Sequence, residues 1–461
     1  MSRFHLMLKW FTYKENITGC AIALIIFVLH LLTISKPAAM MFDEKYYVPE
    51  ANSFLHGGGL TILEHPPLGK WLITAGIAVF GNNATGWRIS PIIFGTASIF
   101  IFYLICVQLT GKEVSGNEKI TPDSPELTQR KSWFTMTTFV PVFATFLFAF
   151  ENLSFIQASI AMLDVFSVTF MLLGFLLYLR GNYLSCGVVM GLAMLCKATA
   201  LLAITAILLH WVIMYHHEIA IDIRHMTNRL RGQNGISHHS VLWDMGKLLI
   251  SVAVVWFALL PLLEYPATHQ LANPISRTMY MVHFHLNYNT ILGSNPNATA
   301  PWQWILHPTN IVYWPGSLVW ISNHFIMPIN AANPLYYASV SWNIWVLIIL
   351  SILYTTYEVI KHRKLHPIIA TFALSWFVGV YILLIPFEIV TKRLMYTYYF
   401  YPAIPAFCLA IAWSAWKLWL NMKKEKKRRV IFLSLLAVYA ISTIVIFFFM
   451  SPFGGRFLIP C

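Results

Sequence analysis

The sequence predicts an all-α polytopic membrane protein. Hydrophobic residues make up 58% of its 461 residues and charged residues only 11%, whereas charged residues run at roughly 25% in soluble domains. The apolar residues form blocks of about 18 to 25, the length a helix needs to cross a hydrocarbon core of ~30 Å. Membrane-spanning strands would be shorter and would alternate apolar and polar residues. We therefore expect a single transmembrane domain over residues 1–461.

Charged residues divide the chain into about eleven predicted spans. These are residues 19–36, 88–110, 133–150, 163–180, 183–197, 198–215, 247–265, 341–360, 367–386, 398–419 and 430–450. The first block follows Lys9 and Lys14. It is longer than the apolar part of a typical signal peptide, so we expect an uncleaved signal anchor.

The positive charge of the chain predicts its orientation. A formal charge of +13 would suit nucleic acid if it were clustered on one face of a soluble domain, but the basic residues lie between apolar blocks, so no nucleic-acid partner is expected. With a cytoplasmic N-terminus, 22 of the 31 Lys and Arg residues fall in inside segments. The positive-inside rule favours this orientation, which we expect in the plasma membrane with the active site extracytoplasmic.

Two long segments are predicted on the outer side, at residues 37–87 and 266–340. The first contains two amphipathic stretches, 43–55 and 68–80, separated by three glycines. Both stretches are too polar or too short to span a membrane. We expect two helices that lie along the outer interface.

The first outer segment also carries the clearest candidates for chemistry. The acidic pair Asp43-Glu44 stands in the string FDEKYYVPEA, just after the first span, where a carboxylate can act as a base toward a hydroxyl. About twenty residues further on, the string EHPPLGK contains Glu64, His65 and Lys70, with two prolines that fix the backbone. Carboxylates at a membrane interface are often only solvated, so the composition alone leaves that alternative open.

Further charges are expected at the same depth. Arg88 begins the second span, Asp164 begins the fourth, and Lys392-Arg393 precede the aromatic run at the tenth. Each of them alone could be an interface anchor or a snorkelling side chain. Together they place both signs of charge at one membrane depth, as a lipid phosphate and a reacting hydroxyl require.

These motifs resemble those of a known family, the protein O-mannosyltransferases, within the GT-C class of polyprenyl-phosphate-sugar transferases. The resemblance runs through most of the chain. It rests on FDEKYYVPEA, EHPPLGKWLITAGIAVFG, GWRISPIIFG, IAMLDVFSVTFMLLGFLLYLR, GLAMLCKATALL, NPISRTMYMVHFHLN and PWQWILHPTNIVYW. The second and fourth are the most specific, because their residue order is not imposed by a membrane helix.

The resemblance implies residue roles. Asp43 would be the base that accepts the proton of a Ser or Thr hydroxyl, and Glu44 would orient acceptor or donor. The cations would hold the donor phosphate: Arg88 and Lys70 by their motifs, and Lys392 and Arg393 by charge and depth alone. Glu64, His65 and Asp164 would line the site.

The implied reaction moves mannose from a polyprenyl-phosphate-mannose lipid to secreted or membrane proteins, with inversion. The lipid-linked sugar is a co-substrate, and the resemblance implies no cofactor and no metal. Eukaryotic members insert a large β-rich domain where this chain has only residues 266–340, so a compact prokaryotic-type member is expected. Two alternatives stay open: a related transferase that moves another sugar to a lipid or glycan acceptor, and a transporter of lipid-linked sugar, although internal repeats and broken helices are not apparent.

Overall fold

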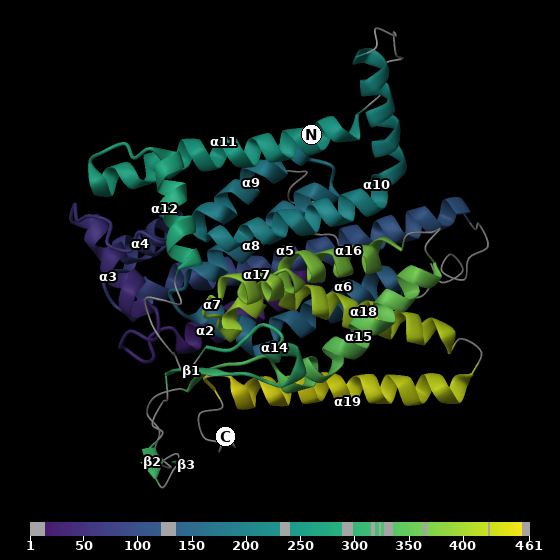
Figure 1. Ribbon diagram of the computed structural model, residues 1–461. Coiled ribbons are helices and arrows are strands. Elements are labelled where there is room, and N and C mark those ends of the chain that lie inside the picture. The colour runs from purple at the N-terminus through teal and green to yellow at the C-terminus, as the bar shows by residue number, and fades with distance from the viewer. Residues whose placement is uncertain are drawn as a thin grey trace, which may run out of the picture.

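The computed structural model describes residues 14–120, 135–230, 240–287, 298–314, 319–321, 324–326, 335–362, 367–422 and 425–453. These residues are mostly helical (Figure 1). Long helices run side by side through the molecule, and shorter helices and strands gather at one end of the bundle (Figure 1). The predicted outer segment 266–340 is described only in part, because residues 288–297, 315–318, 322–323 and 327–334 lie outside the described ranges.

The helices and strands have the following bounds. The first half of the chain forms α2 (Lys14–Thr33), α3 (Glu44–Leu55), α4 (Leu68–Phe80), α5 (Ala84–Ile120), α6 (Met136–Ala149), α7 (Asn152–Ser159), α8 (Leu163–Leu179), α9 (Tyr183–Cys196), η1 (Ala198–Ala200) and α10 (Leu201–Leu230). The second half forms α11 (Val241–Thr268), α12 (Pro274–Leu286), α14 (Gln303–Leu306), β1 (Ile311–Trp314), β2 (Val319–Ile321), β3 (His324–Ile326), β4 (Tyr336–Ala338), α15 (Trp342–Lys361), α16 (Ile368–Phe377), η2 (Val378–Ile382), α17 (Leu384–Thr391), η3 (Thr397–Ala403), α18 (Ile404–Asn421) and α19 (Lys426–Met450). The strands make two antiparallel pairs, β1 with β4 and β2 with β3.

The structure confirms a multi-pass membrane protein, but not the count of eleven spans. Among the described residues, eight helices are long and apolar enough to cross a membrane, or nine if the bent pair α6 and α7 counts as one span. Every predicted apolar block is largely helical. The difference arises because α8, with 17 residues, and α9, with 14, are shorter than a full crossing.

Close packing explains how these two shorter helices are held in the bundle. A side chain added at Gly187 of α9 would come 2.2 Å from the carbonyl oxygen of Leu248, and one at Gly191 would come 2.7 Å from the Cβ of Val255. The two glycines therefore let the backbones of α9 and α11 approach each other, as small residues do between membrane helices.

The two expected amphipathic helices of the first outer segment are present as α3 and α4, within one residue of the predicted bounds. They lie with α12 and β1 at one end of the bundle, and the C-terminal end of α18 and the N-terminal end of α19 lie at the opposite end (Figure 1). The first predicted outer segment and the basic start of α19 therefore occupy opposite ends.

A break that the sequence did not reveal separates α6 from α7, which meet at 59°. Glu151 explains it, because its buried carboxylate accepts hydrogen bonds from the backbone N–H groups of Leu153 and Ser154 and so starts a new helix. The same carboxylate accepts from the N–H of Ser341, which ties the start of α7 to the segment before α15. The carboxylate thus fixes the position of α7 relative to α15.

Candidate active site

The site begins at a strained turn between α2 and α3. Phe42 has a φ of 42°, which is unusual for a bulky residue. Its ring stacks on Tyr313 of β1 with centroids 4.2 Å apart and meets the edge of Tyr398 at 6.0 Å. Packing of the ring thus holds the strained backbone, and strain of this kind gathers at functional sites. Asp43 and Glu44 follow directly.

Glu44 is fully buried and is held from several sides. Arg88 of α5 donates two hydrogen bonds to its carboxylate, from Nε and Nη2, each 2.9 Å long. The backbone N–H groups of Met41 and Ala161 donate to the same carboxylate at 2.8 and 3.0 Å. Glu44 therefore joins the turn before α3 to α5 and to the chain before α8.

Arg88 uses all five of its N–H donors within the protein. Besides the two bonds to Glu44, it donates to the carbonyl oxygens of Ile34, Pro37 and Ala39 at 2.8 to 3.1 Å. A guanidinium has only five N–H donors, so Arg88 fastens residues 34–44 and has none left for a phosphate in this geometry. This arrangement therefore does not favour the predicted contact between Arg88 and a donor phosphate.

Asp43 lies in a different electrostatic setting from its neighbour. Loss of surrounding water raises the pKa of the Asp43 carboxyl to about 7, while Lys197 lowers this pKa and the like charge of Asp164 raises it. A general base works best when its pKa is near the working pH. Asp43 is thus suited to take a proton at neutral pH.

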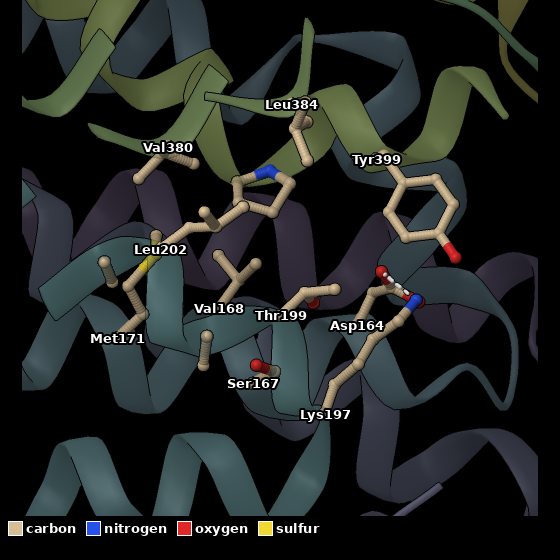
Figure 2. A pocket seen from close by; sticks show the side chains of 13 residues that line it. Asp164, Ser167, Val168, Met171, Lys197, Thr199, Leu202, Val380, Leu384 and Tyr399 are labelled. Carbon is tan, nitrogen blue, oxygen red and sulfur yellow. Dashed lines mark hydrogen bonds and ion pairs between the residues drawn. The ribbon is translucent and has the colours of Figure 1, made fainter. Parts of the chain in front are cut away.

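Asp164 and Lys197 form a buried ion pair at the C-terminal end of α9. The Nζ atom of Lys197 lies 2.7 Å from both carboxylate oxygens of Asp164 (Figure 2). The same ammonium lies 5.0 and 4.8 Å from the ring centroids of Tyr398 and Tyr399, within cation–π distance. Asp164 lies in the first turn of α8, as predicted, and Lys197 follows the last residue of α9. The ion pair therefore places the ends of α8 and α9 at the site.

A cavity opens beside this ion pair. The empty space along its lining, open solvent included, is about 430 Å³, and Asp164, Lys197 and Tyr399 line one part of it. The remaining lining is mostly apolar and includes Val168, Met171, Leu202, Val380 and Leu384 (Figure 2). The lining thus offers charge in one part and hydrocarbon along the rest.

Lys70 and Glu50 form a second buried pair, which holds the loop before α4. The Nζ atom of Lys70 lies 3.2 Å from Glu50 Oε2 and donates to the carbonyl oxygen of Ile62 at 2.7 Å. Glu50 also accepts from the N–H groups of Thr61 and Ile62. Lys70 is fully buried, so its contacts serve to shape the HPPLGK loop rather than to bind a phosphate in this geometry.

That loop brings His65 and Glu64 to the site. The ring of His65 lies 5.8 Å from the ring of Tyr47 and 5.5 Å from that of His285 on α12. Burial lowers the pKa of His65 well below its usual range, with further lowering by Lys197 and His285. His65 is therefore neutral. Burial raises the pKa of Tyr47, and the charge of Glu64 is among those that raise it further.

The two predicted basic residues after α17 differ in position. Arg393 is buried and donates to the hydroxyl oxygen of Tyr399 at 3.0 Å and to the carbonyl oxygen of His285 at 3.2 Å. Lys392 ends α17 in the left-handed conformation and is exposed. Only Arg393 thus belongs to the cluster around Tyr399 and Lys197.

Three charged or polar residues of the site were not singled out in the sequence: Lys197, Tyr399 and Glu50. A signal existed for Lys197, because it is a single cation inside the apolar run GLAMLCKATALL, and ionisable residues inside membrane segments are usually functional. Glu50 lies in α3 at a polar position, where nothing in the periodicity marks its pairing with Lys70 twenty residues on. Within the described residues, no group of three or more His, Cys, Asp or Glu side chains is placed to hold a metal ion.

The chain is similar to known proteins in sequence and in fold. Residues 64–116 match the family model described as dolichyl-phosphate-mannose-protein mannosyltransferase. The polyprenol-phosphate-mannose–protein mannosyltransferase of Corynebacterium glutamicum is 32% identical over 177 residues, which cover 35% of this chain and 29% of that protein. The chain is similar to the protein O-mannosyltransferases, as its motifs predicted.

The similarity of sequence is partial, and the similarity of fold is extensive. The match spans less than a third of the curated mannosyltransferase relatives. The structure of the S. cerevisiae protein O-mannosyltransferase Pmt1-Pmt2 complex bound to the sugar donor aligns with a TM-score of 0.68 at 12% identity, over 96% of this chain and 90% of that chain. The structure of ArnT from Cupriavidus metallidurans bound to undecaprenyl phosphate aligns with a TM-score of 0.52 at 15% identity, over 95% of this chain and 77% of that chain. The fold is that of the GT-C membrane glycosyltransferases.

Proposed function

We propose that this protein transfers mannose from a polyprenyl-phosphate-mannose lipid to Ser and Thr hydroxyls of proteins, with inversion at the anomeric carbon. One observation carries the proposal. Asp43, whose pKa is raised to about 7, is within electrostatic reach of an ion pair that lines one part of a largely apolar cavity. A base beside a cation and a hydrocarbon-lined space is the arrangement that a lipid-phosphate sugar donor and a hydroxyl acceptor require.

In the proposed reaction the Asp43 carboxylate accepts the proton of the acceptor hydroxyl. The oxygen then forms a bond to the anomeric carbon of mannose. The bond from that carbon to the phosphate oxygen breaks, and the polyprenyl phosphate leaves with the electron pair. Cations near this oxygen stabilise the charge that grows on it, which is usually a large contribution to catalysis.

Lys197 and Arg393 are the cations best placed to bind the phosphate. Lys197 lines the cavity, and Arg393 and Lys197 both contact Tyr399. The polyprenyl chain would follow the apolar wall toward Val380 and Leu384.

The other predicted cations would act less directly. Arg88 would act by holding Glu44, and with it the turn that carries Asp43. Lys70 would act by shaping the loop that carries His65. The exposed Lys392 would meet the lipid phosphate only from the surface.

The proposed acceptors are secreted or membrane proteins, reached from the extracytoplasmic side of the plasma membrane. The excess of Lys and Arg in the predicted inside segments supports this orientation, and so does the placement of α3 and α4 at the end opposite the basic start of α19 (Figure 1). Labelling of His56→Cys and Glu425→Cys with an impermeant thiol reagent in intact cells tests it. We expect only position 56 to react, and reaction of both from one side would exclude the orientation.

Transfer of radiolabelled mannose from a polyprenyl-phosphate donor to a Ser/Thr peptide, with purified protein, tests the activity itself. We expect incorporation that is lost in Asp43→Asn. A donor with another sugar and a lipid acceptor, run in parallel, test the related-transferase alternative. Movement of the donor across proteoliposomes without transfer would instead identify a transporter.

A further inference from the structure

Gln157 and Tyr313 form a buried polar pair near Asp43, and the proposed reaction assigns them no role. Gln157 lies near the end of α7, and its Nε2 atom is 2.6 Å from the hydroxyl oxygen of Tyr313 on β1. Gln157 is fully buried and Tyr313 is 5% exposed. The pair joins two segments that are 156 residues apart in sequence, so the fold brings them together at this place.

The hydrogen bonds of this pair are incomplete within the protein. The amide N–H of Gln157 can only donate, so the Tyr313 oxygen accepts from it and its own O–H proton is left to donate elsewhere. The Gln157 carbonyl oxygen, Oε1, is buried and has no partner among the described residues. If the amide is turned over, the phenol donates to its oxygen, and the pair still keeps at least one free donor, an amide N–H, and one free acceptor, the phenol oxygen. A buried polar group without a partner is costly, which suggests that a ligand completes it.

The position of the pair ties it to the reacting groups. The Tyr313 ring stacks on Phe42, the residue directly before Asp43. Burial raises the pKa of Tyr313, and the carboxylates of Asp43 and Asp164 raise it further, so both acids act on its hydroxyl. The phenol therefore stays protonated and able to donate.

We propose that Gln157 and Tyr313 bind an alcohol hydroxyl of one substrate at the active site. An alcohol accepts one hydrogen bond and donates another, which matches the free donor and free acceptor of the pair. The hydroxyl comes either from the acceptor Ser or Thr or from the mannose of the donor. This inference rests on the proposed function, and it makes Tyr313 and Gln157 substrate-binding residues beside the base.

Tyr313→Phe and Gln157→Leu test the proposal, because both keep the size of the side chain and remove its polar atoms. The matched control is Tyr178→Phe, which removes a buried hydroxyl bonded to His210 near the other end of α8. Purified full-length variants are compared by equilibrium binding of the radiolabelled donor, by the KM for a Ser/Thr peptide, and by thermal unfolding in detergent. We expect each site variant to lose roughly ten-fold in kcat/KM, and the double variant to lose little more, since the two residues act as one unit.

The source of the hydroxyl is read from the same measurements. Weaker donor binding assigns the pair to the sugar, whereas a raised peptide KM with unchanged donor binding assigns it to the acceptor. The proposal is overturned if both site variants match Tyr178→Phe in donor binding and in peptide KM while the wild type transfers mannose. A wild type that transfers no mannose would fault the proposed function instead, so the two failures are distinguishable.

Discussion

Arg88 and Glu44 are joined by two parallel hydrogen bonds of 2.9 Å, with both side chains fully buried. A planar guanidinium matches a carboxylate in this way, and a lysine ammonium does not. Three carbonyl oxygens of residues 34–39 occupy the other donors of Arg88. The pair thus fixes the backbone on both sides of the turn that carries Asp43.

Arg88→Ala should destabilise the protein by about 3 to 5 kcal/mol, because it leaves the Glu44 carboxylate buried without its cation. Arg88→Lys should recover only part of this loss. Thermal unfolding in detergent measures it, with the exposed Arg428→Ala, which breaks a surface pair with Glu425, as a control that should cost little. If Arg88→Ala instead weakens donor binding without any loss of stability, Arg88 contacts the phosphate as the motif resemblance implied.

Lys70→Met should likewise destabilise by about 3 to 5 kcal/mol, because Glu50 would keep a buried charge with no cation. The double variant Glu50→Gln/Lys70→Met removes both charges and should regain much of that stability. Donor affinity of the folded double variant then distinguishes a structural role of Lys70 from direct binding of the donor phosphate. A large loss of donor affinity in the double variant would contradict a purely structural role.

Asp43 should make the activity depend on pH near neutrality. The base must be deprotonated to act, and its pKa is raised to about 7. We therefore expect kcat/KM to rise as the pH rises through about 7 and then to level off. Asp43→Asn should lower kcat by about 10²- to 10⁴-fold. It should also remove this rise of kcat/KM with pH, the rising limb of the pH profile. A pH profile from about 5.5 to 9 measures both, and near wild-type turnover by Asp43→Asn would exclude the assignment.

The same pKa shift predicts that stability, unlike activity, falls as the pH rises. The folded pKa of Asp43 lies above its unfolded value, so the folded state binds more protons between the two values, and stability falls as the pH rises through about 7. Asp43→Asn removes that loss. It should therefore unfold at a higher temperature than the wild type at about pH 8, with little difference at about pH 4. A lower unfolding temperature at the higher pH would show that the Asp43 charge carries no such cost.

The sequence predicted the parts of this site whose pattern is local. The bounds of α3 and α4 followed from amphipathic spacing, and the acidic pair stood out just after an apolar block. The contrast between Asp43 and Glu44 was not predictable, because it depends on Arg88, 44 residues away from Glu44, and on Lys197 and Asp164 beside Asp43. Contacts between distant segments leave no periodic trace in one chain.

The count of eleven spans was not confirmed, for a related reason. Reading charged residues as punctuation divided the region from 163 to 215 into three full spans, and this made Lys197 a boundary marker. In the structure Lys197 ends a 14-residue helix and points into the site, toward Asp164 (Figure 2). Short helices of this kind are stable only because their neighbours bury them, and the sequence of one helix does not contain that information.

Lys197 and Asp164 should shift the pH profile of the activity in opposite directions. Lys197 lowers the pKa of Asp43 and Asp164 raises it. Lys197→Met should therefore move the rising limb of kcat/KM to higher pH, and Asp164→Asn should move it to lower pH. In the double variant the two effects oppose each other, so its limb should lie between those of the single variants.

Lys197→Met should also lower kcat by about 10²- to 10³-fold above the pH range of this rise, because the cation proposed to face the leaving phosphate is lost. Lys197→Arg keeps the charge and should keep the position of the limb, although its larger head disturbs the 2.7 Å contacts with Asp164. The measurement is kcat/KM against pH for the wild type and each variant, all checked for a single species in detergent. Shifts in the same direction for Lys197→Met and Asp164→Asn would show that general disturbance of the fold, and not charge, sets the profile. Opposite shifts together with an unshifted Lys197→Arg would place Asp43, Asp164 and Lys197 in one electrostatic unit.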